Sequence, residues 1–195
     1  MKNKNYQRVL LSIGMLMAAL PLSAHPLWSE GGSLSSGLLH PFLGIDHVIA
    51  MLAVGMWAVQ RGARFVWKIP LVFSLILLMG VVLAGTGIQL PMTETIIALS
   101  ILILGILISM RSSVHLYIGM LMIACFAIYH GYAHGIAIPA GAITVEYLAG
   151  LWLSTALLHF AGILAALFMQ HVSNRVLRWC SVPLIGLGSL LLLSI

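Results

Sequence analysis

The sequence predicts an all-α integral membrane protein, a six-transmembrane-helix bundle that follows a cleavable N-terminal signal peptide. The chain has 195 residues, of which 62% are hydrophobic and 7% charged, and its mean hydropathy is +1.13. Several apolar stretches are long enough to cross ~30 Å of hydrocarbon as helices, which satisfy their own backbone polar groups. This composition excludes an ordinary soluble domain.

The N-terminus, residues 1–24, has the pattern of a secretory signal peptide. A basic start is followed by an apolar core, residues 9–20, and by small residues up to Ala24. The core is short for a membrane span, so we expect cleavage after Ala24. Cleavage leaves residues 25–195 as the six-helix domain, whereas an uncleaved first helix is the alternative.

The distribution of basic residues predicts how the spans are oriented. Alternate loops hold all nine Lys and Arg residues, and by the positive-inside rule these loops are cytoplasmic. The mature N- and C-termini then lie outside the cytoplasm. The net charge of +5 is therefore a topology signal and not a nucleic-acid footprint. The six predicted spans are residues 36–59, 69–87, 95–110, 114–134, 145–170 and a last span that ends at residue 195.

A first polar motif, His40-Pro41-Phe42-Leu43-Gly44-Ile45-Asp46-His47, stands at the start of the first span. If residues 40–59 form one helix, His40 and His47 are two turns apart and share a face. Asp46 then lies in the outer part of the membrane. Ionisable groups at this depth usually mark an ion pathway.

A second motif, His130-Gly131-Tyr132-Ala133-His134, places two imidazoles on one face at the outer end of the fourth span. Imidazole nitrogen with carboxylate oxygen suits Ni²⁺, Co²⁺ or Zn²⁺. We expect the first and fourth spans to pack together with their imidazoles facing each other, because small residues permit close approach. The small residues that suggest this packing are Gly37, Gly44, Gly131 and Gly135.

The other polar residues allow plainer interpretations. His159 is read equally well as a hydrogen-bonding residue between helices or as a functional group. His115 and His171 are at predicted cytoplasmic helix ends, where interfacial placement is expected. Glu30 and Glu94 are interpreted as solvated loop acids. The two cysteines, which have no C-x-x-C spacing, predict neither a disulfide nor a thiolate metal site.

The first motif resembles the H-P-x-x-G-x-D-H motif of the HupE/UreJ family of bacterial nickel and cobalt permeases. The second, with Gly135, resembles that family's H-G-x-x-H-G-x-E motif. Where the family has the final Glu, this chain has Ala137. Glu146, at the start of the fifth span, is the candidate to replace that acid. The resemblance covers essentially the whole chain.

The resemblance implies a permease domain in the bacterial cell (inner) membrane that imports nickel or cobalt for metalloenzyme maturation or cobalamin synthesis. It implies no enzymatic activity and no tightly bound cofactor, since Ni²⁺ or Co²⁺ is the transported ion. The expected partners are the ion and the lipid bilayer, and a homo-oligomer is left open. The candidate metal ligands are His40, Asp46, His47, His130, His134 and Glu146.

Two other functions fit parts of the pattern. A membrane haem protein would use one His from the first span and one from the fourth as axial ligands, but it leaves Asp46 unexplained. An intramembrane hydrolase ranks third, because the sequence contains neither G-x-S-x-G nor H-E-x-x-H.

Overall fold

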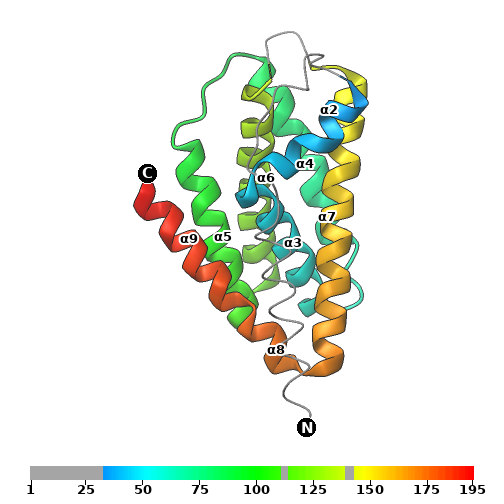
Figure 1. The fold of residues 1–195 in the computed structure, drawn as a ribbon, viewed down its shortest axis with the longest axis vertical. Helices are drawn as coiled ribbons and strands as arrows, with labels where there is room; N and C mark the ends of the chain where they lie inside the picture. The colour runs from blue at the N-terminus through cyan, green and yellow to red at the C-terminus, as the bar shows by residue number, and fades with distance from the viewer. Residues whose placement is uncertain (1–32, 111–113, 139–142) are drawn as a thin grey trace.

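A computed structural model describes residues 33–110, 114–138 and 143–195 of the chain, and these residues form helices joined by turns and loops, without strands (Figure 1). The predicted signal peptide, residues 1–24, lies outside the described residues. The elements are α2 (Leu34–Leu39), η1 (His40–Leu43), α3 (Ile45–Gln60), α4 (Lys68–Gly85), α5 (Thr93–Met110), α6 (Leu116–Ile136), α7 (Val145–Val172), α8 (Asn174–Trp179) and α9 (Ser181–Ser194).

Helix length and composition confirm an all-helical protein of the membrane class. Five segments are long and apolar enough to cross a bilayer: α4, α5, α6, α7 and the stretch Arg175–Ser194, which contains most of α8 and all of α9. A sixth is present if the bent pair formed by residues 34–43 and α3 counts as one span.

The first predicted span is not one straight helix. The axis turns by 90° between residues 34–43 and α3. Pro41 has no N–H to extend the hydrogen-bond ladder of α2, and Gly44 is in an extended conformation, with φ −111° and ψ 114°. His40 and His47 therefore belong to different elements, and the expectation that they share one helical face is wrong.

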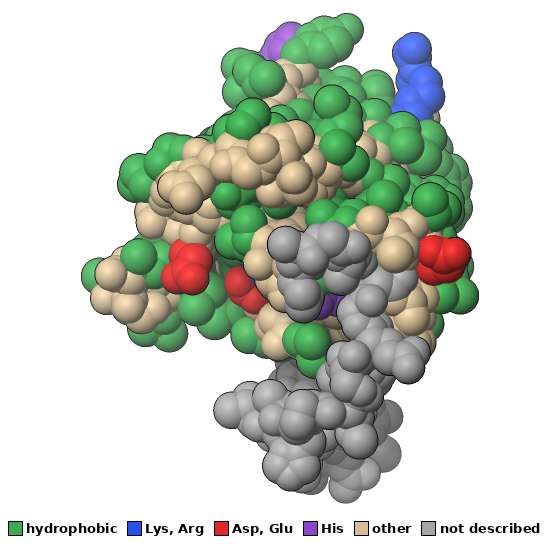
Figure 2. Space-filling view, turned by 90° about the horizontal axis from the view of Figure 1, so that it is seen from above, with side chains coloured by type: hydrophobic (Ala, Val, Ile, Leu, Met, Phe, Trp, Pro, Cys, Tyr) green, Lys and Arg blue, Asp and Glu red, His purple; other side chains and the backbone are tan. Residues whose placement is uncertain are grey.

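The bundle has two chemically different ends. In Figure 1 the upper end holds α2, the starts of α5 and α7 and the last turns of α4 and α6, while α8 is at the lower end. Seen from above, the upper end shows carboxylates on its face and a basic side chain only at its margin (Figure 2). The described basic residues flank the lower ends of the helices: Arg61, Arg64, Lys68, Arg175 and Arg178.

α3 forms the centre of the core, with ten of its sixteen residues buried. It packs against α7 at two glycines, since Gly55 lies on the backbone of His159 and Gly162 lies on the backbone of Leu52. These close contacts fix the position of α7 along the axis of α3. They place His159 at the level of Gly55.

α6 packs mainly against α4, and the predicted pairing of its glycines with the first span is wrong. A Cβ at Gly131 would collide with the Leu77 backbone of α4, and one at Gly135 would meet Ala84. Gly37 packs on the backbone of α7 at Tyr147. The small residues do allow close approach, but to partners other than those expected.

Candidate metal site

Four imidazoles meet near the upper end of the bundle. The His47 ring centroid is 4.4 Å from that of His134 and 5.1 Å from that of His130. The His40 ring is 5.0 Å from His134. These rings come from η1, α3 and α6, so the bend at Gly44 brings both halves of the first motif to the second motif. We call these four rings the imidazole cluster.

Asp46 orients the His47 ring of the cluster. The Nδ1 atom of His47 lies 2.9 Å from Oδ1 of Asp46, and the two side chains are 13% and 29% exposed. An ionised carboxylate only accepts hydrogen bonds, so Nδ1 carries the proton and donates. In the neutral ring, Nε2 then keeps a lone pair. A carboxylate that anchors the second nitrogen is the usual support of a metal-binding histidine.

The two α6 rings are more deeply buried. His130 is 0% exposed and His134 is 2% exposed. His130 donates from Nδ1 to the Phe126 carbonyl oxygen at 2.9 Å, which again leaves Nε2 with its lone pair. Nε2 of His130 and Nε2 of His134 have no hydrogen-bond partner. Buried polar atoms of this kind are costly without a partner, and a cation would satisfy them.

The cluster is not a closed coordination sphere. Within the described ranges, no group of three or more His, Cys, Asp or Glu side chains is arranged so that it could hold a metal ion as it stands. The rings contact one another edge to face or at a tilt, with interplanar angles of 58° to 71°. An ion would bind several nitrogens only after one or more rings turn. Such a site favours transient binding over storage.

Two cavities adjoin the cluster. The larger, of about 910 Å³, lies between the upper ends of α3, α5, α6 and α9, and Asp46, His47 and Glu94 line it. The smaller, of about 130 Å³, is lined by His40, His134 and the same Asp46–His47 pair. The Asp46–His47 pair therefore borders both cavities.

Glu94, which the sequence analysis interpreted as a solvated loop acid, is exposed as expected, but it lies in a helix at the edge of this site. It is in the first turn of α5 and shares the larger cavity with Asp46. Its position could have suggested a role, because it begins a helix at the same end of the bundle as both motifs. A second carboxylate beside the cavity makes the space more attractive to a cation.

Glu146 is not brought to the cluster. It is exposed in the first turn of α7 and lines neither cavity, whereas the neighbouring Tyr147 points inward with its ring 5.9 Å from His40. Ala137 lines both cavities. The position at which the related motif carries Glu thus borders the site, and its role is not taken over by Glu146 in this geometry.

The haem alternative finds no support in the cluster. Axial ligation of one haem by two histidines requires the macrocycle to lie between their rings. Here the rings from the first and second motifs are in direct contact, with centroids 4.4 to 5.1 Å apart. They leave no space for a porphyrin.

Comparison with known proteins agrees with the motifs. The family model described as "HupE / UreJ protein" matches residues 13–191. The chain is also 36% identical over 174 residues to "Protein HupE" of Rhizobium leguminosarum bv. viciae, an alignment that covers 89% of this chain and 91% of that protein. No solved structure matches it. A family match over nearly the whole length, with both histidine motifs gathered at one end of a helical bundle, shows that this chain belongs to the HupE/UreJ family.

Proposed function

We propose that this protein is a permease that admits Ni²⁺ or Co²⁺ into the cell through the imidazole cluster. Membership of a family generally related to nickel and cobalt transport supports the class of function. The observation that carries the proposal for this chain is the contact among four imidazoles from three elements beside a cavity lined by two carboxylates.

Capture begins in the larger cavity. Asp46 and Glu94 attract a hydrated dication there. The ion exchanges part of its water for Nε2 of His47, whose ring Asp46 holds in position. Imidazole nitrogen suits Ni²⁺ and Co²⁺ better than it suits Mg²⁺ or Ca²⁺. The cavity therefore concentrates cations, and the imidazole cluster selects among them.

Passage continues toward the α6 rings. His134 is in contact with both His40 and His47, and His130 is in contact with His47. The buried Nε2 atoms of the two α6 histidines receive the ion next. Conduction needs sites that bind well enough to admit an ion and loosely enough to release it. An incomplete ligand set meets both needs.

The orientation follows from charge. The basic lower end lies in the cytoplasm by the positive-inside rule, so the cavity and the imidazole cluster face outward. We place the protein in the inner membrane, with the mature N- and C-termini outside the cytoplasm. Nickel or cobalt that enters in this direction supplies metalloenzyme maturation or cobalamin synthesis.

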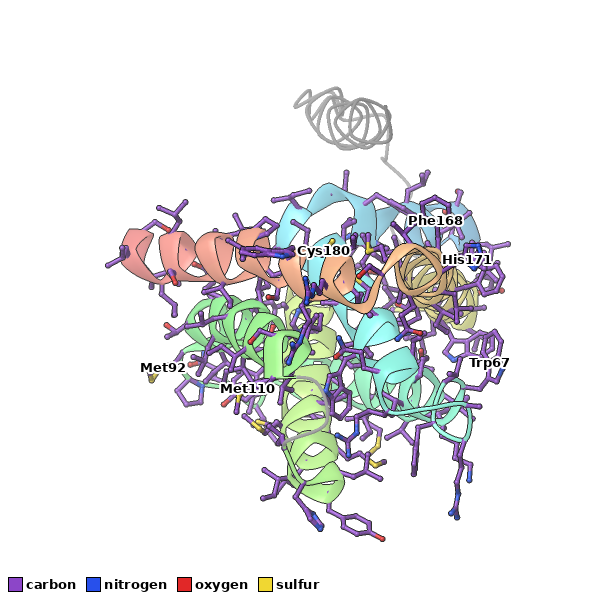
Figure 3. All side chains as sticks on the ribbon, turned by 90° about the horizontal axis from the view of Figure 1, so that it is seen from below. Trp67, Met92, Met110, Phe168, His171 and Cys180 are labelled. Carbon is purple, nitrogen blue, oxygen red and sulfur yellow. The ribbon has the colours of Figure 1, made fainter. Side chains whose placement is uncertain are left out.

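Uptake of radioactive nickel and cobalt by cells tests this function. Cells that make the protein should accumulate one or both ions faster than cells with an empty vector, and the His134→Ala variant should lose this gain. The control is His171→Ala, because His171 is exposed near the end of α7, at the rim of the lower end (Figure 3). Equal uptake with and without the protein, when immunoblots show it in the membrane, would refute the proposal.

A further inference from the structure

Below the imidazole cluster, α7 carries another histidine that the route described so far does not use. His159 is 1% exposed. Its Nδ1 lies 3.5 Å from Oγ of Ser74, whose hydroxyl donates to the Pro70 carbonyl at 2.9 Å. Ser74 therefore accepts from Nδ1–H, and Nε2 of His159 keeps a lone pair. That atom has no hydrogen-bond partner.

A single aromatic side chain connects this histidine to the imidazole cluster. The Phe73 ring is fully buried, and its centroid is 6.0 Å from that of His130 and 5.0 Å from that of His159. His159 is level with Gly55 of α3. Eight residues separate Gly55 from His47 along α3, which corresponds to ~12 Å along the helix axis. His159 thus lies deeper in the membrane, one ring beyond the cluster.

A second unsatisfied polar atom accompanies His159. Thr155 is 0% exposed, and its Oγ1 has no hydrogen-bond partner. It precedes His159 by four residues on α7 and therefore shares its helical face. A hydrogen bond to Ser74 accounts for one nitrogen of His159, but it leaves Nε2 and the Thr155 hydroxyl without a partner. In a hydrocarbon environment both need water or an ion.

Space adjoins His159 and Ser74 between α4 and α7. A cavity of about 240 Å³ between α4 and α7 is lined by His159, Ser74 and Trp67, together with other aromatic and aliphatic side chains. Trp67 immediately precedes α4 at the basic lower end, and Figure 3 shows it at the margin of the bundle in the view from below. Apart from His159 and Ser74 the lining is largely apolar, so water in this cavity would gather at these two polar side chains.

We propose that Nε2 of His159, with the hydroxyl of Thr155, forms a second, inner binding site for the transported divalent cation, and that Ser74 orients the His159 ring. The ion occupies it after the imidazole cluster and before release toward the basic end. The identity of the cation rests on the proposed function. One imidazole and one neutral hydroxyl form a weaker ligand set than the outer site, since they carry no charge. A weaker inner site would release the ion readily toward the basic end.

Cysteine accessibility tests whether water and the ion reach this position. In a protein with Cys125 and Cys180 replaced by Ala, the His159→Cys variant should react with a small charged methanethiosulfonate reagent. Co²⁺ should slow the reaction at least threefold through the remaining outer and hydroxyl ligands. The control is Leu157→Cys, because Leu157 is 51% exposed on α7 and does not line the cavity beside His159. A thiol at 159 that stays as inert as the one at 157 would overturn the inner site.

Transport kinetics give an independent test with a side chain of similar size. Thr155→Val should lower the maximal rate of Co²⁺ uptake about fivefold and leave the half-saturating concentration unchanged. His47→Ala should instead raise that concentration, because it acts at the entrance. An unchanged maximal rate in Thr155→Val would count against the inner site even if the His159→Cys protein failed to reach the membrane.

The two proposals fail in different ways. If the unaltered chain transports neither ion, the proposed function is wrong, whereas the accessibility of position 159 to water and its protection by Co²⁺ can still be measured. If uptake is normal but position 159 is inert and Thr155→Val has no effect, the inner site alone is wrong.

Discussion

Three histidines of this protein share the same hydrogen-bonding arrangement. His47, His130 and His159 each donate from Nδ1 to an oxygen, namely the Asp46 carboxylate, the Phe126 carbonyl and the Ser74 hydroxyl. Each ring is thereby held in one tautomer with the Nε2 lone pair free. These hydrogen bonds orient the rings toward the interior of the bundle without using the nitrogen that binds a metal.

Replacing Asp46 by Asn removes the charge but keeps an oxygen that can accept from His47. We expect metal capture to weaken by ~10–100-fold, as when other carboxylates that orient metal-binding histidines are lost. Uptake measured over a range of Ni²⁺ concentrations should show this as a higher half-saturating concentration, with the protein still present in the membrane.

The comparison for Asp46→Asn is Glu146→Gln, which neutralises an exposed acid outside both cavities. We expect near-normal uptake in that variant. If Asp46→Asn transports normally, the carboxylate is structural. If Glu146→Gln loses uptake, the acid at the start of α7 reaches the ion in a conformation other than the one described.

At the scale of elements, the bend between η1 and α3 positions the site. The φ of Gly44 is −111°, which any residue can adopt, so backbone conformation does not require glycine there. Glycine is needed because it has no Cβ and therefore leaves space. A Cβ at Gly44 would lie 2.6 Å from Asp46 Oδ1 and 2.9 Å from His47 Nδ1. It would therefore displace the pair that borders the two cavities.

We accordingly predict that Gly44→Ala impairs uptake at least tenfold with little change in thermal stability. Fluorescence-detected melting of the purified protein and uptake by cells measure the two effects. The control for uptake is Gly62→Ala, where no atom lies within 4 Å of the added Cβ. Because the φ of 94° at Gly62 is strained for Ala, we expect this variant to lose some thermal stability but to keep normal uptake. Normal uptake by Gly44→Ala would show that the pair tolerates displacement.

For the contact between α4 and α6 we predict the opposite pattern, in which a substitution lowers the stability of the fold and uptake falls as a result. Gly131→Leu places a large side chain against the Leu77 backbone, so it should separate α6 from α4 and lower the melting temperature. Uptake should fall together with the amount of folded protein. Gly186→Leu is the control, because nothing lies within 4 Å of its Cβ. An unchanged melting temperature in Gly131→Leu would contradict the packing of these two helices.

The sequence predicted the bounds of the helices better than it predicted which helices pack against each other. Apolar length located α4 to α7 within a few residues, because hydrocarbon thickness sets that length. The bend was missed, although Pro41 and Gly44 are both helix-breaking signals, because apolar length was given more weight than either residue. The partner of Gly131 was also missed. A small residue indicates that some backbone comes close, but it does not indicate which one.

For the candidate site, sequence spacing identified four imidazoles and Asp46 because ionisable residues are rare at this depth in a membrane. It did not predict that Glu94 lines the cavity beside Asp46. That carboxylate reaches the same cavity only through the folding of α5 beside α3, a contact between residues almost fifty positions apart in the chain. His159 stayed ambiguous because a single histidine has no spacing to interpret.

At the scale of the whole molecule, the distribution of charge predicts orientation. A C-terminal alkaline phosphatase fusion should be active, since that enzyme folds only outside the cytoplasm, and a fusion after Arg64 should be inactive. N-terminal sequencing of the membrane-purified protein should begin at or near His25. An active fusion at Arg64 with an inactive one at the C-terminus would invert the orientation and place the imidazole cluster on the cytoplasmic side.

The abrupt start of α3 has an electrostatic consequence. Because the chain bends at Gly44, the first turn of α3, with Asp46 in it and no side-chain cap, begins at the imidazole cluster. The aligned peptide dipoles of α3 give this terminus a partial positive charge, which stabilises a nearby carboxylate by ~0.3–1 kcal/mol. The same partial charge repels a dication. The helix terminus thus favours the ionised form of Asp46, and in the proposed route it would limit how tightly the carboxylate holds the ion and shorten the time that each ion spends at the entrance.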